Sequence, residues 1–495
     1  MSFQTISCLY FSRIVSFFYF FSIRFAIRKI KWKYKLQITE DNFMKIHFIA
    51  IGGSVMHNMA IAMHENGHTV TGSDDEIFDP AKGRLAARNI LPETTGWYAA
   101  KITADLDAII LGMHAREDNP ELIEAKKLGV KIYSFPEYIY EQSKNKIRVV
   151  IGGSHGKTTI TAMVMHVLKL LGRDFDYMVG AQLEGFETMF RLSNAPLIIL
   201  EGDEYLTSTL DKRPKFHLYK PHIALISGIA WDHINVFPTF EMYVDQFRVF
   251  IQLIEPNGTL IYCANDENVK NISNGARQDI ISKPYGVPEY SIRNGITKVV
   301  FDEKPTDIMV FGKHNLMNLN GARLICESLG ISTVSFMQAI ASFKGAAKRL
   351  ELISKNETTA CYKDFAHSPS KLQATINAAK EQYPERQLIA CMELHTYSSL
   401  NSDFLKQYKD AMKDADVAVV FYSSHALEIK KMPPLAAELV KSSFGRSDLH
   451  VFNVKDELIA FLEAIEWKNK NLLMMSSGGF DNLDFKELAI NLQIV

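Results

Sequence analysis

The feature that most constrains the fold of this chain is a short apolar run followed by a glycine-rich turn and a helical pattern. The run Ile147–Ile151 has the pattern of a buried strand, the turn reads GSHGKTT, and the helical pattern continues to Leu171. A strand, a glycine turn and a helix in this order begin a βαβ unit, which builds sheets of parallel strands. The chain is therefore predicted to be an α/β protein.

The same alternation is found on both sides of this turn. Before it, Ile46–Ile51 ends in two glycines and is followed by a helical pattern at Met56–Glu65 and a second strand at His68–Gly72. After it, further strands are predicted at Leu197–Leu200, Ile223–Ser227, Thr259–Cys263, Ala360–Lys363, Gln387–Met392, Val417–Tyr422 and Leu472–Ser476. A chain of 495 residues has room for two or three domains. We expect domains at 44–146, 147–342 and 343–495, with a polar linker at Ser143–Lys146.

Residues 1–43 differ from the rest of the chain. Phe and Tyr crowd the stretch Leu9–Phe25, and Arg24–Lys35 is strongly basic. Arg13 and Arg24 interrupt the apolar stretch well short of the roughly 20 residues that span a bilayer, which argues against a membrane anchor. Because Met44 opens the first strand pattern, MKIHFIAIGG, residues 1–43 are predicted to be a non-native or disordered extension without stable membrane association.

The charge balance excludes a global attraction to nucleic acid. The 55 Lys and Arg against 56 Asp and Glu leave a formal charge of -1, so an anionic ligand has to be held by a local site. The five cysteines include no CxxC pair. We expect reduced thiols in a cytoplasmic protein with no nucleic-acid partner.

The turn GSHGKTT is a candidate phosphate site. Glycine-rich backbone amides at a helix N-terminus bind phosphates, Lys157 would hold the β- and γ-phosphates, and the Thr158 hydroxyl would bind magnesium. The full GxxxxGK[ST] pattern is not met, because Ile151 stands at its first glycine. The alternative is an ordinary glycine-rich turn between a strand and a helix.

Two further polar residues follow predicted strands. Glu201 ends the strand in LIILEGDEY, and His233 follows ALIS in SGIAWDH. Open α/β sheets place ligands at these strand ends, so both residues could join Thr158 in holding one or two magnesium ions. Alternatively, Glu201 caps a helix and His233 is a surface turn residue.

Five motifs resemble those of the Mur ligase family. GSHGKTT, EGDE, the DH of WDH, GKHNLMNLNGA and DFAHSP occur in the family's order, and the resemblance covers Met44 to the C-terminus. It implies three domains: a Rossmann-like N-terminal domain that binds a UDP-sugar, a central P-loop ATPase, and a Rossmann-like C-terminal domain for the amine acceptor. HFIAIGGSVM and TGSDD resemble the branch that uses UDP-N-acetylmuramate.

The resemblance implies roles for individual residues. ATP would be bound by Gly153, Ser154, His155, Gly156, Lys157, Thr158, Thr159, His314, Asn315, Asn318, Arg349 and Asp364. Catalytic residues would be Lys157, Glu201, His233, Arg349 and Asp364, with Thr158, Glu201 and His233 on the metal. Gly52, Gly53, Ser54 and Asp74 would bind the UDP-sugar, and His367, His395 and Tyr397 the acceptor. Ser368 stands where the family motif has a second histidine. Some family members carry a carbamylated lysine after the DH motif, but no lysine occurs between Trp231 and Pro256, so none is predicted here.

Competing interpretations remain for parts of the chain. A nicotinamide site is one reading of Gly52 to Asp74, but Val55 and Met56 stand where its fingerprint needs a glycine. A P-loop switch or motor would hydrolyse ATP without a sugar nucleotide. A nucleotide-sugar sensor would not need Lys157, Glu201 and His233.

The acceptor is predicted mainly from one position, with support from two segments, GMHAREDNPE at Gly112–Glu121 and MSSGGF at Met475–Phe480, which resemble the peptide-adding members. Family members that add L-alanine carry an arginine that grips the amino-acid carboxylate, and Ser399 stands at that place in ELHTYSS. The resemblance therefore favours the murein peptide ligases, which add the recycled tripeptide L-alanyl-γ-D-glutamyl-meso-diaminopimelate in peptidoglycan recycling. Addition of L-alanine in de novo synthesis is the alternative. Either reaction would use ATP and Mg²⁺ and pass through an acyl phosphate.

Overall fold

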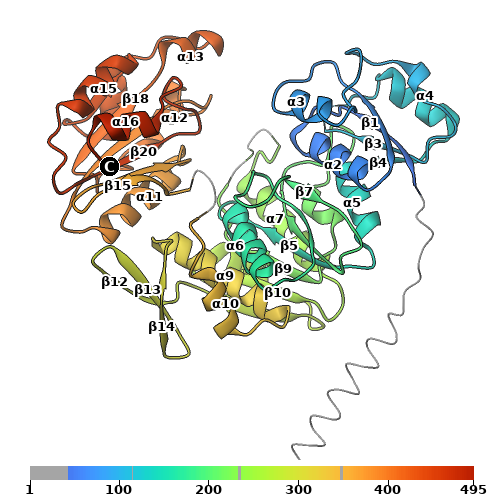
Figure 1. The fold of residues 1–495 in the computed structure, drawn as a ribbon, viewed down its shortest axis with the longest axis horizontal. Helices are drawn as coiled ribbons and strands as arrows, with labels where there is room; N and C mark the ends of the chain where they lie inside the picture. Colours follow the sequence, from blue (N-terminus) through green and yellow to red (C-terminus); the bar gives the residue numbers. More distant parts are fainter. Residues whose placement is uncertain (1–42, 114, 232, 234–235, 346–348, 495) are drawn as a thin grey trace, which may run out of the picture. The chain divides into compact units, whose positions relative to one another are not determined.

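The computed structural model describes residues 43–113, 115–231, 233, 236–345 and 349–494 of the chain. These residues form three α/β domains, each built on its own largely parallel sheet (Figure 1). The predicted fold class is confirmed. Residues 1–42 of the predicted extension lie outside the described residues.

The N-terminal domain has a four-stranded parallel sheet. Its elements are β1 (Lys45–Ile49), α2 (Ser54–Glu65), β2 (Thr69–Ser73), α3 (Ala81–Ala86), η1 (Ala99–Lys101), β3 (Ala108–Leu111), α4 (Pro120–Leu128), β4 (Ile132–Ser134) and α5 (Phe135–Ser143). The strand order is β2-β1-β3-β4, with parallel pairing throughout. Helix α5 starts directly after β4 because Ser134 and Glu137 form a reciprocal capping box.

The middle domain has a seven-stranded sheet with β5 at its centre. Its elements are β5 (Ile147–Gly152), α6 (Lys157–Leu170), β6 (Asp176–Met178), β7 (Phe190–Arg191), β8 (Leu197–Glu201), η2 (Lys215–Leu218), β9 (Ile223–Ile226), α7 (Phe240–Gln252), β10 (Thr259–Cys263), α8 (Glu267–Ser273), β11 (Ile281–Tyr285), α9 (Lys313–Ser328) and α10 (Thr333–Ile340). The order is β11-β10-β9-β5-β8-β6-β7, and only the edge strand β7 is antiparallel to its neighbour. Strand β5 is buried from its second residue onward, as its apolar sequence requires.

A small antiparallel sheet follows the middle sheet in the chain. It consists of β12 (Glu289–Arg293), β13 (Ile296–Phe301) and β14 (Lys304–Ile308), in that order. The sequence analysis missed it. Its strands carry charged residues and mix exposed positions with half-buried and buried ones, so they lack the continuous apolar runs that mark the parallel strands.

The C-terminal domain has a six-stranded sheet. Its elements are β15 (Glu351–Lys355), β16 (Ala360–Asp364), α11 (Pro369–Gln382), β17 (Gln387–Glu393), α12 (Ser402–Leu405), η3 (Lys406–Tyr408), β18 (Val417–Phe421), α13 (Ser424–Ile429), α14 (Ala437–Phe444), β19 (His450–Phe452), α15 (Lys455–Glu463), β20 (Lys470–Met475) and α16 (Phe485–Asn491). The order is β15-β16-β20-β17-β18-β19, and only β15 is antiparallel to its neighbour. All the parallel strands predicted for this domain are present.

The segment predicted to be a polar linker between the first two domains connects α5 to β5 and is held by hydrogen bonds from Arg148. Ser143 is the last residue of α5, and the guanidinium of the buried Arg148 donates to the carbonyls of Ser143, Lys144 and Lys146. The same guanidinium donates to two carbonyls of residues 219 and 220 and, at 2.7 Å, to Glu255 Oε1. The backbone carbonyls of this segment are therefore satisfied by a buried donor.

No helix among the described residues combines the length and apolar character needed to cross a bilayer. The cysteines of the same residues, Cys263, Cys326, Cys361 and Cys391, are all buried free thiols.

We expect Arg148→Leu to lower the free energy of unfolding by about 3 kcal/mol, because it leaves Glu255 and several carbonyls without their buried donor. The measurement is thermal and urea unfolding followed by circular dichroism. Arg293→Leu removes an exposed arginine of β12 and serves as the control, with an expected change below about 0.5 kcal/mol. Equal effects of the two substitutions would contradict this role of Arg148.

Candidate nucleotide site

Three loops of the middle domain meet at one edge of its sheet. Strand β5 pairs in parallel with β8 on one side and with β9 on the other. The turn after β5, Glu201 at the end of β8 and the loop from Ser227 after β9 therefore share the carboxyl edge. This is where open α/β sheets bind ligands. The inference that these three segments come together is confirmed by the pairing.

The turn after β5 depends on two of its glycines. Gly153 has φ 124°, and an added Cβ would lie 2.2 Å from Ser227 Oγ. Gly156 has φ 84°, and an added Cβ would lie 2.4 Å from Asn318 Oδ1. No other residue adopts these angles in so little space. The turn therefore brings its backbone close to α9, and α6 begins at Lys157.

Lys157 is held from two sides at the start of α6. Its Nζ donates to Gly153 O at 2.6 Å and to Glu204 Oε2 at 2.7 Å. Burial by itself lowers the pKa of Lys157, but the carboxylates of Glu204, Glu201 and Asp203 outweigh it and raise the pKa above its ordinary value. The amine is therefore charged at neutral pH.

The predicted metal ligands form two contacts rather than one cluster. Thr158 Oγ1 donates to Glu201 Oε1 at 2.8 Å, whereas His233 Nε2 lies 3.8 Å from Glu204 Oε1. The described residues contain no group of three or more His, Cys, Asp or Glu side chains that could hold a metal ion by themselves. A hydroxyl and a carboxylate nevertheless suit Mg²⁺, which takes few protein ligands and completes its shell with phosphate oxygens and water.

The predicted adenine-contacting residues lie in the first turns of α9. Asn315 and Asn318 are buried, and Asn315 Nδ2 donates to Phe311 O at 3.0 Å. Burial, together with the nearby charge of Arg349, lowers the pKa of His314 to about 4. His314 is therefore a neutral imidazole at physiological pH.

The C-terminal domain contributes Arg349 and Asp364 to the same cavity. The Asp364 carboxylate accepts hydrogen bonds from Leu350 N and Ala366 N, both at 2.7 Å, and from Thr375 Oγ1 at 3.3 Å. Arg349 lies with its guanidinium carbon 4.9 Å from the ring centroid of Phe365. Asp364 thus fixes the backbone beside Arg349.

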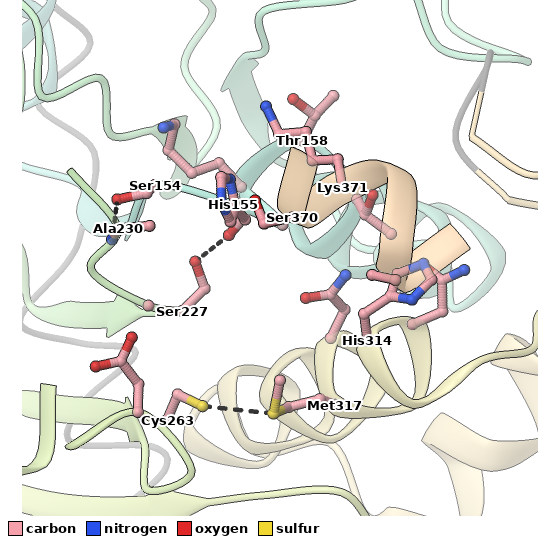
Figure 2. A pocket seen from close by; sticks show the side chains of 18 of the residues that line it. Ser154, His155, Thr158, Ser227, Ala230, Cys263, His314, Met317, Ser370 and Lys371 are labelled. Atoms are coloured by element: carbon pink, nitrogen blue, oxygen red, sulfur yellow. Dashed lines mark hydrogen bonds between the residues drawn. The ribbon is translucent and has the colours of Figure 1, made fainter. Parts of the chain in front are cut away.

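These side chains line one cavity of about 590 Å³. The cavity lining contains most of the predicted ATP and catalytic residues, namely Ser154, His155, Gly156, Lys157, Thr158, Thr159, Glu201, His233, His314, Asn315, Asn318, Arg349 and Asp364. Gly153 is not one of the lining residues, but its carbonyl oxygen accepts a hydrogen bond from Lys157 Nζ. Figure 2 shows two hydrogen bonds that join the turn after β5 to the loop after β9: Ala230 N donates to Ser154 Oγ, and Ser227 Oγ donates to His155 O.

The sequence analysis missed several polar lining residues, among them Glu204, Asp266, Ser370 and Lys371. Glu204 stands in the EGDEY segment, three residues beyond Glu201, and Asp266 accepts from Ile229 N at 2.8 Å. Ser370 and Lys371 belong to the first turn of α11, directly after DFAHSP (Figure 2). Glu204 stands within the recognised EGDE motif, and Ser370 and Lys371 follow DFAHSP directly, so reading these motifs one helical turn further would have found them, whereas Asp266 lies near no recognised motif.

The predicted UDP-sugar residues lie together in the N-terminal domain. Gly52 N donates to Asp74 Oδ2 at 2.7 Å, and an added Cβ on Gly52 would lie 2.9 Å from the same oxygen. Gly53 and Ser54 begin α2 directly after this turn. Burial, with the neighbouring Asp75, raises the pKa of Asp74 to about 6.

The predicted acceptor residues lie outside the lining of this cavity. Tyr408 OH donates to His367 O at 2.5 Å, His395 Nδ1 lies 3.7 Å from Glu393 Oε1, and Tyr397 is largely exposed. Ser399 is fully buried, and its hydroxyl donates to Thr396 O at 3.1 Å.

Three family profiles match consecutive parts of the chain: Mur ligase family, catalytic domain, at 45–146; Mur ligase middle domain at 151–326; and Mur ligase, glutamate ligase domain, at 348–478. A curated UDP-N-acetylmuramate–L-alanine ligase from Sulfurihydrogenibium sp. (strain YO3AOP1) is 30% identical over 449 residues, covering 89% of this chain and 96% of the relative.

Two solved structures share the fold. The UDP-N-acetylmuramate-alanine ligase of Thermotoga maritima has a TM-score of 0.63 at 23% identity, covering 89% of this chain and 97% of its own. A murein peptide ligase from Psychrobacter arcticus 273-4 has a TM-score of 0.58 at 22% identity, covering 91% and 99%.

The raised pKa of Asp74 predicts a pH dependence of stability. Between about pH 4 and 6 the folded protein keeps a proton on Asp74 that the unfolded chain has released, so stability falls as pH rises through this window. Asp74→Asn keeps an acceptor for Gly52 N and should remove this fall. Melting temperatures at pH 4.5 and 7.5 test it, with the exposed Glu76→Gln as the control. An unchanged difference between the two pH values in the Asp74 variant would contradict the prediction.

Proposed function

Since the chain belongs to the Mur ligase family, we propose that it joins the carboxylate of UDP-N-acetylmuramate to the amino group of L-alanine. The family assigns it to the ADP-forming acid–amino-acid ligases, which depend on ATP. The identity of both substrates and the role of each residue belong to the proposal. So do the domain boundaries at 44–146, 147–342 and 343–495. A cytoplasmic location and the absence of a nucleic-acid partner stay predictions.

The observation that carries the proposal is the composition of the 590 Å³ cavity. It combines a glycine-rich turn and Lys157 from the middle domain with Arg349 from the C-terminal domain. A carboxylate and an ammonium do not condense at neutral pH, so the carboxylate has to be activated first. Attack of the lactyl carboxylate on the γ-phosphorus of ATP forms a C–O–P bond and releases ADP. The free amine then attacks the acyl carbon, phosphate leaves, and the amine proton is released.

The residues of the cavity support each of these steps. Lys157, at the end of the glycine-rich turn, neutralises charge that develops on the transferring phosphoryl group. Arg349, anchored beside Asp364, is placed to reach the phosphates from the other domain. His314, Asn315 and Asn318 line the side of the cavity formed by α9, where the base would lie. Since groups from two domains are needed, water is excluded only when both face the nucleotide.

We propose that Mg²⁺ is held by Thr158 and Glu201, with His233 nearby. Bound there, the ion would supply Lewis-acid stabilisation of phosphate charge. Thr158 Oγ1 and Glu201 Oε1 are already 2.8 Å apart, and the second carboxylate oxygen of Glu201 accepts from Gly180 N at 2.8 Å. The hydrogen bond from Gly180 orients the carboxylate, as outer partners of metal ligands commonly do.

L-alanine is favoured as the acceptor by the relatives and not by a residue of the chain. The Sulfurihydrogenibium ligase matches over 96% of its length, and its name states L-alanine as the amino acid. This finding favours the alternative over the tripeptide that the sequence analysis preferred. The preference for the tripeptide rested mainly on Ser399, whose buried hydroxyl closes a turn with Thr396. The identity of Ser399 is therefore explained by the structure of this turn and says little about the acceptor.

The tripeptide L-alanyl-γ-D-glutamyl-meso-diaminopimelate stays a second candidate. Ser399 offers no guanidinium for a bidentate carboxylate contact. His395 and the exposed Tyr397 stand in the same segment, and an acceptor larger than one amino acid could reach them.

A product assay separates the two acceptors. The protein is incubated with ATP, Mg²⁺ and UDP-N-acetylmuramate, with L-alanine or the tripeptide in parallel reactions, and products are identified by mass spectrometry. We expect ADP and UDP-N-acetylmuramoyl-L-alanine, with kcat/KM for L-alanine at least tenfold above that for the tripeptide. A preference for the tripeptide would establish the second candidate, and ADP release without sugar nucleotide would point to a simple ATPase.

Lys157→Ala should lower ADP formation in the complete reaction by a factor of about 100 or more, because it removes the cation nearest the phosphate turn. Lys169→Ala, on the same helix but outside the cavity, is the matched control and should retain the wild-type rate. A wild-type rate for Lys157→Ala in the coupled ADP assay would show that the phosphate site is elsewhere.

A further inference from the structure

The buried carboxylate of Glu204 has no role in the mechanism described above. It is 1% exposed and lies 2.7 Å from Lys157 Nζ, the cation assigned to the phosphates. A lysine ammonium has three N–H groups, and two of them are taken by Glu204 and the carbonyl of Gly153. An incoming phosphate therefore meets a cation that already has a counter-anion.

Glu204 is fixed in this position by a chain of hydrogen bonds. The phenol of the buried Tyr243 donates to Glu204 Oε1 at 3.1 Å and lies 2.8 Å from Ser154 Oγ. Because the Tyr243 proton points to the carboxylate, the Ser154 hydroxyl donates to Tyr243, and Ser154 Oγ in turn accepts from Ala230 N at 2.9 Å. The carboxylate is thus held from two sides, by the Lys157 ammonium and by the Tyr243 phenol of α7.

The formal charge of the cavity lining has the wrong sign for a bare triphosphate. The described lining carries four carboxylates, Glu201, Glu204, Asp266 and Asp364, and three cations, Lys157, Arg349 and Lys371. A nucleotide with about four negative charges gains little from such a lining. A divalent ion that travels with the phosphates reverses this balance.

We propose that Glu204 is a positioning residue which, as the fixed counter-anion of Lys157, makes the site select magnesium-bound nucleotide over free nucleotide. Glu204 acts through Lys157: it holds Nζ against the turn and cancels much of its attraction for an unmetallated phosphate chain. Magnesium removes two of the phosphate charges, so the repulsion from Glu204 weakens when the ion is present. The inference rests on the nucleotide site of the proposed function and adds a determinant of its ligand form.

Isothermal titration calorimetry of the full chain with ATP and with ADP, each in Mg²⁺ and in EDTA, tests this inference. Glu204→Gln keeps an acceptor for Lys157 and removes only the charge. It should tighten binding in EDTA by about tenfold, the effect of one like charge at close range, and change binding in Mg²⁺ by less than about threefold. Binding in EDTA that is unchanged or weaker in the folded variant overturns the inference, as does equal tightening in both conditions.

Two further variants separate charge from local structure. Tyr243→Phe removes the phenol bond but keeps the Glu204 charge, so the preference for magnesium-bound nucleotide should stay as in the wild type. If it tightens EDTA binding as much as Glu204→Gln does, the charge is not the cause and the inference is wrong. Should the Gln variant lack a cooperative melting transition, Glu204→Met removes the same charge with an apolar side chain, and the same criteria apply.

The wild-type titration separates a failure of the proposed nucleotide site from a failure of the role proposed for Glu204. If the wild-type chain binds neither ATP nor ADP in Mg²⁺, the nucleotide site and the proposed function both fail. If it binds them, and Glu204→Gln has the wild-type preference for the magnesium form, only the role of Glu204 is refuted.

Discussion

The parallel pairing of β5 with β8 and β9 is the constraint on which the middle domain depends. It brings to one edge three segments that are separated by about 25 to 75 residues in the chain: the turn after β5, Glu201 and the loop from Ser227. Nothing in the local sequence of these segments requires them to meet. The tight fit of Gly153 against Ser227, and of Gly156 against Asn318, follows once the strands are paired. The sheet therefore sets the geometry, and the glycines permit it.

Electrostatics within this frame are unusual for a site that takes an anion. Lys157 is surrounded by Glu201, Asp203 and Glu204, which keep it protonated but also weaken its field. Asp203 is in turn paired with Lys215, at 2.5 Å. Much of the cavity's charge is thus internally compensated, as buried ions have to be. A ligand can gain binding energy only by displacing or extending these pairs, which favours a ligand that carries its own cation.

Sequence reasoning went furthest where one residue type has one physical use. The glycines and lysine of GSHGKTT, and the apolar runs of the buried parallel strands, were recognised because few other structures need them. Glu204 was passed over within a motif that had been recognised, because sequence does not tell which of two nearby carboxylates turns towards Lys157. Lys371 was missed because its place depends on the direction of α11. Strands β12, β13 and β14 mix exposed and buried positions and gave no continuous apolar signal, and Ser399 was given weight before its burial was known.

The three hydrogen bonds that Asp364 accepts connect distant parts of the C-terminal domain. They join the backbone next to Arg349 to the end of β16 and to Thr375 within α11. The main chain beside Arg349 is therefore held to β16 and α11 through Asp364. A compound that binds this guanidinium is thereby coupled, through Asp364, to a strand and a helix of the C-terminal domain.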